Sequence, residues 1–119
     1  MRRFIVFGLL SVWSLLFCLP SEAQINKQYF YEKGRTDLMN KNYGAAIESF
    51  NILTQADPSL YDAYFFKAIA KYNLGDLIGA QTDFSKAVEL NPVFTYAYHY
   101  RAIVRTSMGA FQEALRDLE

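Results

Sequence analysis

Reactive side chains are scarce in this sequence of 119 residues. It contains one cysteine, Cys18, and one histidine, His99, so no internal disulfide can form and a zinc site would lack ligands. The six glycines are isolated from one another, which argues against a glycine-rich phosphate loop. No His-x-x-x-His, Gly-x-Ser-x-Gly or Ser-x-x-Lys arrangement carries catalytic chemistry. We therefore expect no catalytic residue, no metal and no cofactor, and the chain is not predicted to be an enzyme.

Two pairs of basic residues have the spacing of one helical face. They are Lys67 with Lys71 and Arg101 with Arg105. The favoured interpretation is a solvated face, or pairing with Asp83 and Asp117, in which each exposed pair contributes under about 1 kcal/mol. The alternative is a stripe that binds an anion.

Composition narrows the class of protein further. Twelve basic and twelve acidic residues give a net charge of zero, and 52% of the residues are apolar. A nucleic-acid-binding domain would be expected to carry a basic surplus, and a disordered chain would be less apolar. The length allows one small domain, and the zero net charge predicts no nucleic-acid partner.

The segment 1–23 differs from the remainder of the chain. Arg2 and Arg3 precede an apolar run from residue 4 to residue 19, and Pro20 and a short segment with small residues follow. This is the pattern of a secretory signal peptide, and the run is shorter than the roughly 20 residues that span a bilayer as a helix. We predict a signal-peptide helix at 1–23 and an exported, periplasmic or extracellular mature chain from 24 to 119. Contact with a membrane would come only through an uncleaved signal.

The mature chain repeats with a fixed period. The units are 27–60, 61–94 and 95–119, and the last is incomplete. Aromatic, small and proline residues recur in the same columns of each unit. Examples are Phe30 with Tyr64 and Tyr98, Gly34 with Ala68 and Ala102, Phe50 with Phe84 and Leu118, and Pro58 with Pro92.

Each unit is predicted to be a helix, a tight turn and a second helix. Apolar residues step by three and four within each half, and the prolines end the second helix. Gly75 and Asp76 predict a helix stop followed by an N-cap carboxylate. Ser59 and Asp62 are spaced as a capping box.

These columns resemble the tetratricopeptide repeat over residues 27–119. The matching residues in the second unit are Tyr64, Ala68, Ala80, Phe84, Ala87 and Pro92. The resemblance implies an all-α fold, a right-handed α-solenoid of helix-turn-helix pairs whose first helices line a concave groove. The sequence departs from the pattern where Lys33, Lys67 and Arg101 replace a leucine, and packing there is expected to use neighbours such as Ile69 and Tyr72.

The resemblance also implies which residues contact a partner. The candidate groove residues are Tyr31, Arg35, Asp62, Phe65, Ile69, Tyr72, Tyr96, His99 and Ile103. This surface suits an extended peptide or an amphipathic helix. Ordinary packing is an alternative for Tyr31, Phe65 and Tyr96, and it is favoured for His99 and for Phe66 and Tyr100. Related domains that grip a chaperone C-terminal carboxylate use a Lys/Asn/Arg cluster, of which only Arg35 is present.

The predicted function is a protein-interaction module or assembly scaffold with a protein or peptide partner. One alternative is a regulatory or sensory segment of a larger enzyme or signalling protein. Another is a structural solenoid that self-associates through its open C-terminal repeat. Because the third unit stops inside its second helix, we expect the sequence to be the N-terminal part of a longer protein, or the open edge to pair with another chain.

Overall fold

The computed structural model describes residues 25–119, which form six α-helices and no β-strand. The helices are α2 (Lys27–Met39), α3 (Tyr43–Ala56), α4 (Tyr61–Asn73), α5 (Leu77–Leu90), α6 (Thr95–Ser107) and α7 (Phe111–Leu118). The all-α prediction is confirmed for this part of the chain. The predicted signal peptide at 1–23 lies outside the described residues.

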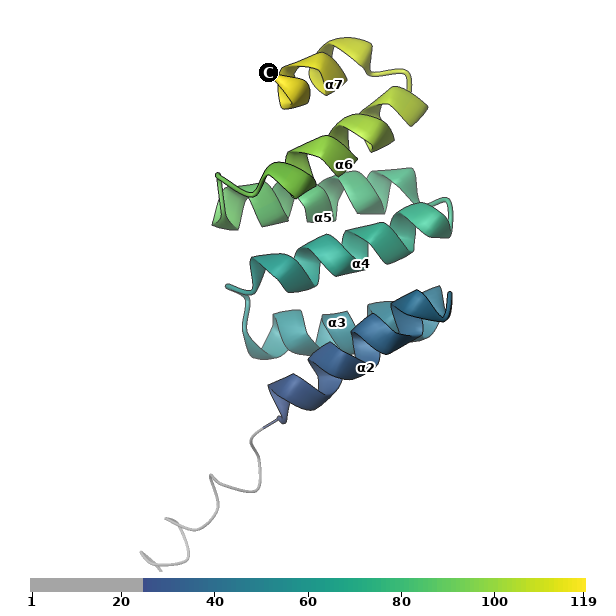
Figure 1. Cartoon of the computed structure of the whole chain (residues 1–119), viewed down its shortest axis with the longest axis vertical. Helices are drawn as coiled ribbons and strands as arrows, with labels where there is room; N and C mark the ends of the chain where they lie inside the picture. The colour runs from purple at the N-terminus through teal and green to yellow at the C-terminus, as the bar shows by residue number, and fades with distance from the viewer. Residues whose placement is uncertain (1–24) are drawn as a thin grey trace, which may run out of the picture.

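The helices follow one another as a stack. Each helix packs against the next in sequence, and α2 also contacts α4. Figure 1 shows the chain running back and forth while it advances from α2 at one end to α7 at the other. First helices α2, α4 and α6 therefore alternate with second helices α3, α5 and α7.

A left-handed backbone residue closes the turn inside each helix pair. Lys41, Gly75 and Gly109 have φ angles of 62°, 82° and 79°, and they occupy the same position of successive units. Glycine adopts this conformation without steric cost, whereas a residue with a side chain is strained by it. The first turn is therefore built with a lysine where the other two use glycine.

One of the two predicted helix starts is confirmed and the other is wrong. Asp76 accepts a hydrogen bond from the Gly79 backbone N–H at 2.9 Å and caps α5. The capping box at Ser59 does not form, because α4 begins after Leu60 and no side chain caps it. Ser59 instead donates its backbone N–H and its hydroxyl to the Asp57 carboxylate. Ser59 therefore bonds to Asp57, two residues before it, and does not cap the N-terminus of α4.

Two apolar clusters form the core, one at each junction between helix pairs. The first contains Phe50 and Leu53 of α3 with Ala63 and Ala70 of α4. The second contains Phe84 of α5 with residues of α4 and α6. An aromatic pair is stacked at each junction, Phe50 with Phe66 at 5.8 Å and Phe84 with Tyr100 at 5.9 Å between ring centroids. The same packing therefore occurs twice.

The small-residue column sits where the two helices of a pair approach. Gly34, Ala68 and Ala102 are all buried. A methyl group on Gly34 would lie 2.8 Å from Cζ of Phe50, whose side chain is fully buried. The first pair has thus closed around a glycine, whereas the other two accommodate alanine.

We predict that Gly34→Ala destabilises the protein and that Gly44→Ala does not. Overpacking against Phe50 should lower the free energy of unfolding by about 1–3 kcal/mol. At Gly44, in α3, a new Cβ would meet nothing within 4 Å. Alanine there should raise the free energy of unfolding by about 0.5 kcal/mol through helix propensity. Urea unfolding followed by circular dichroism measures both, and equal effects at the two sites would contradict the packing argument.

Candidate functional site

An aromatic and charged cluster joins α2 to α4. The Tyr31 hydroxyl donates a 2.9 Å hydrogen bond to Oδ2 of Asp62. The Arg35 guanidinium lies over two rings, 5.9 Å from the centroid of Tyr31 and 5.8 Å from that of Phe66. These distances are those of cation–π contacts. Three of the residues predicted for the groove, Tyr31, Arg35 and Asp62, are therefore brought together.

Arg35 differs from most cations of the chain. Its side chain is exposed, and within residues 25–119 it forms no ion pair. The contacts with the two rings are not hydrogen bonds, so the N–H donors of the guanidinium remain available. Such a fork matches the two oxygens of a carboxylate.

Burial and the hydrogen bond to Asp62 both raise the pKa of Tyr31. Burial raises the pKa of Tyr31 to about 12, and the hydrogen bond and negative charge of Asp62 act in the same direction. Both effects disfavour the tyrosinate form. Tyr31 therefore acts as a hydrogen-bond donor that fixes Asp62 at ordinary pH.

A hollow lies beside this cluster. Its volume is about 360 Å³, and it is lined by Lys27, Gln28, Tyr31, Leu53, Leu60 and Asp62. At its rim, Lys27 pairs with Asp57 at 3.2 Å. The lining combines apolar side chains with polar ones, as expected where an apolar group binds in a defined orientation.

A second hollow lies at the other end of the stack. It has a volume of about 240 Å³ and is lined by His99, Ala102, Ile103, Thr106, Ser107 and Leu118. Two further predicted groove residues, His99 and Ile103, meet here. His99 also contacts Tyr100 edge to face, with centroids 5.8 Å apart.

The remaining predicted groove residues divide into surface and core. Tyr96 is 68% exposed, while Ile69 and Tyr72 are half-buried and pack against the second apolar cluster. Phe65 requires a correction, because it is only 7% exposed. Its ring is surrounded by those of Phe66, Phe84, Phe94 and Tyr100. Phe65 therefore packs in the core, and the groove assignment of this residue is wrong.

Phe66 has a part in the cluster that the sequence did not reveal. It was predicted as a packing residue, and it does pack on Phe50. It also underlies the Arg35 guanidinium. The four-residue spacing of Tyr31 and Arg35 within one helix is visible in the sequence, whereas contact with Phe66 depends on how α2 lies against α4.

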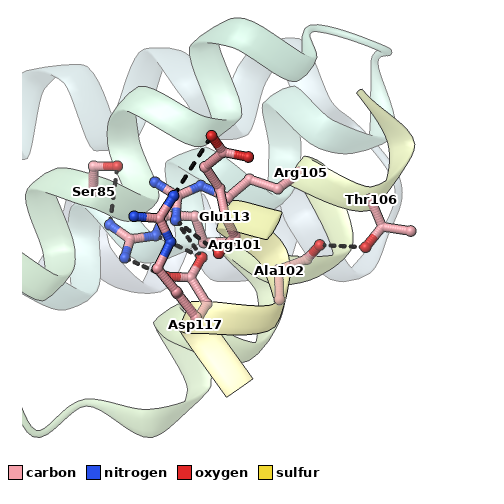
Figure 2. Close-up of polar contacts among 8 residues, drawn as sticks. Ser85, Arg101, Ala102, Arg105, Thr106, Glu113 and Asp117 are labelled. Atoms are coloured by element: carbon pink, nitrogen blue, oxygen red, sulfur yellow. Dashed lines mark hydrogen bonds and ion pairs between the residues drawn. The ribbon is translucent and has the colours of Figure 1, made fainter. Parts of the chain in front are cut away.

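The basic pairs bind buried aspartates. Asp117 of α7 accepts hydrogen bonds from Arg101 at 3.0 and 2.5 Å and from Arg105 at 2.8 Å, and 4% of its side chain is exposed. Figure 2 shows Arg101 and Arg105 converging on Asp117, with Ser85 bound to Arg101 on the other side. The predicted pairing is confirmed, but these are not the exposed, weak pairs that were expected.

The second unit repeats this arrangement with lysines. Asp83 lies 3.7 Å from Lys67 and 2.8 Å from Lys71. Burial lowers the pKa of Lys67, although Asp83 opposes this effect. The aspartate occupies the position that an external anion would need, so the alternative of an anion-binding stripe is contradicted at both clusters.

The first unit departs from this scheme. Lys33 pairs with Asp37 of its own helix at 2.6 Å. In α3, Ser49 stands at the position of the repeat that Asp83 and Asp117 occupy in the later units. Helices α2 and α3 are therefore not joined by a central ion pair.

Among residues 25–119, no group of three or more His, Cys, Asp or Glu side chains is arranged to hold a metal ion. Within the same range, no helix has the length and apolar character needed to cross a membrane.

Comparison with known proteins places the chain in one fold class. No protein-family model matches it. The tetratricopeptide repeat and J domain-containing co-chaperone DNJ1 of Cryptococcus neoformans is 29% identical over 101 residues, 85% of this chain and 18% of that protein. Protein FlbA of Caulobacter vibrioides is 32% identical over 74 residues, 62% of this chain and 12% of that protein. The chain thus spans less than a fifth of the length of these relatives.

Solved structures agree. The first tetratricopeptide repeat domain of Spaghetti (RPAP3), bound to the HSP90 peptide SRMEEVD, superposes with a TM-score of 0.74 at 28% identity, covering 76% of this chain and 72% of that one. MamA superposes with a TM-score of 0.75 at 24% identity, covering 87% of this chain and 58% of that one. The chain has the fold of a tetratricopeptide repeat domain.

We predict that Asp117→Ala destabilises the protein far more than Asp37→Ala. Removing Asp117 leaves two largely buried guanidinium groups unpaired, and the free energy of unfolding should fall by about 3 kcal/mol. Asp37 pairs with a lysine whose side chain is 42% exposed, so its loss should change stability little. Urea unfolding measures both variants. Similar losses of unfolding free energy in the two variants would show that burial of the ion pair does not determine its contribution to stability.

We also predict that Asp62→Asn lowers the pKa of Tyr31 from about 12 toward its ordinary value of 10.0. A raised folded-state pKa contributes stability that is present below pH 10 and is lost as the pH rises from 10 to 12. Tyrosinate absorbance, taken as the difference from Tyr31→Phe, isolates this titration among the nine tyrosines. Ordinary titration of Tyr31 in the unaltered protein would contradict the prediction.

Proposed function

We propose that this chain is a protein-interaction module that binds an extended peptide or an amphipathic helix across α2, α4 and α6. The observation that carries the proposal is the exposed Arg35 guanidinium, which lies over Tyr31 and Phe66 beside a hollow lined by both polar and apolar side chains. A cation fixed by aromatic rings loses little side-chain entropy on binding, which favours affinity.

The chemistry of the cluster indicates the kind of ligand. Arg35 would bind one carboxylate, and the hollow beside Leu60 would take an apolar side chain. Asp62, oriented by Tyr31, would accept a hydrogen bond from the ligand backbone. The RPAP3 domain is bound to a peptide with two adjacent glutamates. Of the Lys/Asn/Arg cluster with which related domains grip a C-terminal carboxylate, this chain has only Arg35. We therefore propose a ligand that is more apolar than the peptide bound to the RPAP3 domain.

A peptide selected from a displayed library on the 119-residue chain provides the test. Arg35→Ala should weaken its binding by about tenfold, the effect of losing a charged hydrogen bond. Lys41→Ala is the matched control, since Lys41 is an exposed cation that likewise makes no ion pair within residues 25–119. If neither Arg35→Ala nor Tyr72→Ala changed the affinity for the peptide, the proposal that the peptide binds in the groove would be refuted.

A regulatory segment of a larger protein is a second candidate function. The relative DNJ1 combines tetratricopeptide repeats with a J domain. In such an arrangement the repeats would select a client and another domain would act on it. The groove variants would then reduce client capture without altering the other domain.

We propose in addition that the chain is exported. The support is the charged start, the apolar run at 4–19 and the small residues before Gln24. Intact mass of the protein recovered from the secreted or periplasmic fraction should show a chain that starts at Gln24. A cytoplasmic protein that retains Met1 and Arg2 would refute export.

A further inference from the structure

Two opposite charges of the α2–α4 cluster have no ionic partner. Within residues 25–119, neither Arg35 nor Asp62 takes part in an ion pair. Lys27, which lines the same hollow as Asp62, is by contrast paired with Asp57. Arg35 is exposed, but Asp62 is half-buried. A charge that is drawn into a protein is usually paired, because it loses hydration without compensation if it is not.

The ring of Tyr31 keeps these two charges apart. The Arg35 guanidinium lies over the ring, 5.9 Å from its centroid, whereas Asp62 accepts a 2.9 Å hydrogen bond from the hydroxyl at the ring's edge. Arg35 and Asp62 could not pair with each other without giving up these contacts. A fixed separation of opposite charges is complementary to a ligand that carries the same two charges in reverse.

The polar groups of the hollow that are half-buried are acceptors. Tyr31 donates its only hydroxyl hydrogen to Asp62, so its oxygen can only accept a further bond. Asp62 accepts bonds from Tyr31 and from the Ala63 backbone N–H, and a carboxylate has about four acceptor sites in all. Leu53, which is buried, and Leu60, which is half-buried, supply the apolar part of the lining. A hydrogen-bond donor on an apolar stem would therefore match both parts.

A basic side chain matches this lining more fully than an uncharged donor does. The methylene stem of lysine or arginine would lie on Leu53 and Leu60 while the charged head reaches Asp62. An uncharged donor, such as the indole N–H of a tryptophan, would cover the apolar lining but leave the charge of Asp62 uncompensated. Glu32, exposed on α2, is a second carboxylate that acts on the cluster. Two carboxylates against one guanidinium favour a cation in the hollow.

We propose that the ligand of the groove carries an acidic and a basic side chain together, a carboxylate for Arg35 and a lysine or arginine head for Asp62. This inference rests on the function proposed above, and it specifies the apolar group in the hollow as the stem of the basic residue. Asp62 has acceptor sites for both the basic head and a backbone N–H. Tyr31 is the positioning residue, because it holds Asp62 and lies under Arg35.

Peptides selected on the 119-residue chain provide the test. They should share a basic residue in addition to an acidic one. Replacing that basic residue by norleucine keeps an apolar stem and removes the charge. Fluorescence anisotropy should show binding weakened at least about tenfold, the effect of losing one charged hydrogen bond. With Asp62→Asn, the two peptides should bind within about twofold of each other, because the group that distinguishes them is gone.

Two further variants serve as controls. Glu48→Gln is the matched control, since Glu48 is an exposed carboxylate on α3 that also makes no ion pair within residues 25–119. The tenfold difference between the peptides should persist in this variant. Tyr31→Phe keeps the ring under Arg35 but removes the hydrogen bond that holds Asp62, so it should reduce the difference. Circular dichroism verifies that each variant is folded.

The outcomes separate this inference from the function on which it rests. If Arg35→Ala weakens binding but norleucine does not, the peptide binds in the groove and the inference is wrong. Selected peptides without a basic residue, or a difference between the peptides that persists in Asp62→Asn, would also overturn it. If neither Arg35→Ala nor Tyr72→Ala changes the affinity, the proposed function fails and the inference fails with it. Self-association of the chain that Asp62→Asn abolishes would overturn it in favour of a second copy.

Discussion

Burial of one large apolar side chain per second helix is the constraint on which the structure depends. Phe50 and Phe84 project from α3 and α5, and neither can be covered by the helix paired with it alone. Each is covered by the first helix of the next pair, so stability is shared between neighbours rather than contained in one unit. This dependence explains why successive helices contact one another from α2 to α7.

Much of the fold was predictable because it depends on short-range patterns. The repeat period, the turn at Gly75 and the cap at Asp76 follow from spacing and local backbone chemistry. The pairing of Arg101 and Arg105 with Asp117 could be anticipated for the same reason. Its burial could not, because the depth of a polar group depends on the helices packed around it.

The candidate site was predictable only in part. A helical stripe identifies which residues share a face, but not which of them are covered by a neighbouring helix. Phe65 lies on the predicted stripe and is buried by Phe94, whose position depends on the loop before α6. The hydrogen bond from Tyr31 to Asp62 and the contact of Arg35 with Phe66 likewise join different helices. Spacing along one sequence gives no signal for such contacts, because they depend on how two helices lie against each other.

In the first unit the paired aspartate, Asp37, lies on the first helix and not on the second, and this affects the order in which the helices unfold. Asp83 and Asp117 tie α5 to α4 and α7 to α6, whereas Asp37 pairs with Lys33 within α2. Gly34 is also the one buried residue of α2. We expect α2 to detach at a lower free energy than the rest of the stack, as a separate cooperative unit. Since Tyr31 and Arg35 lie on α2, half of the groove exists only while this helix is docked. The apparent affinity of a ligand that bridges α2 and α4 is therefore reduced in proportion to the fraction of molecules in which α2 is detached.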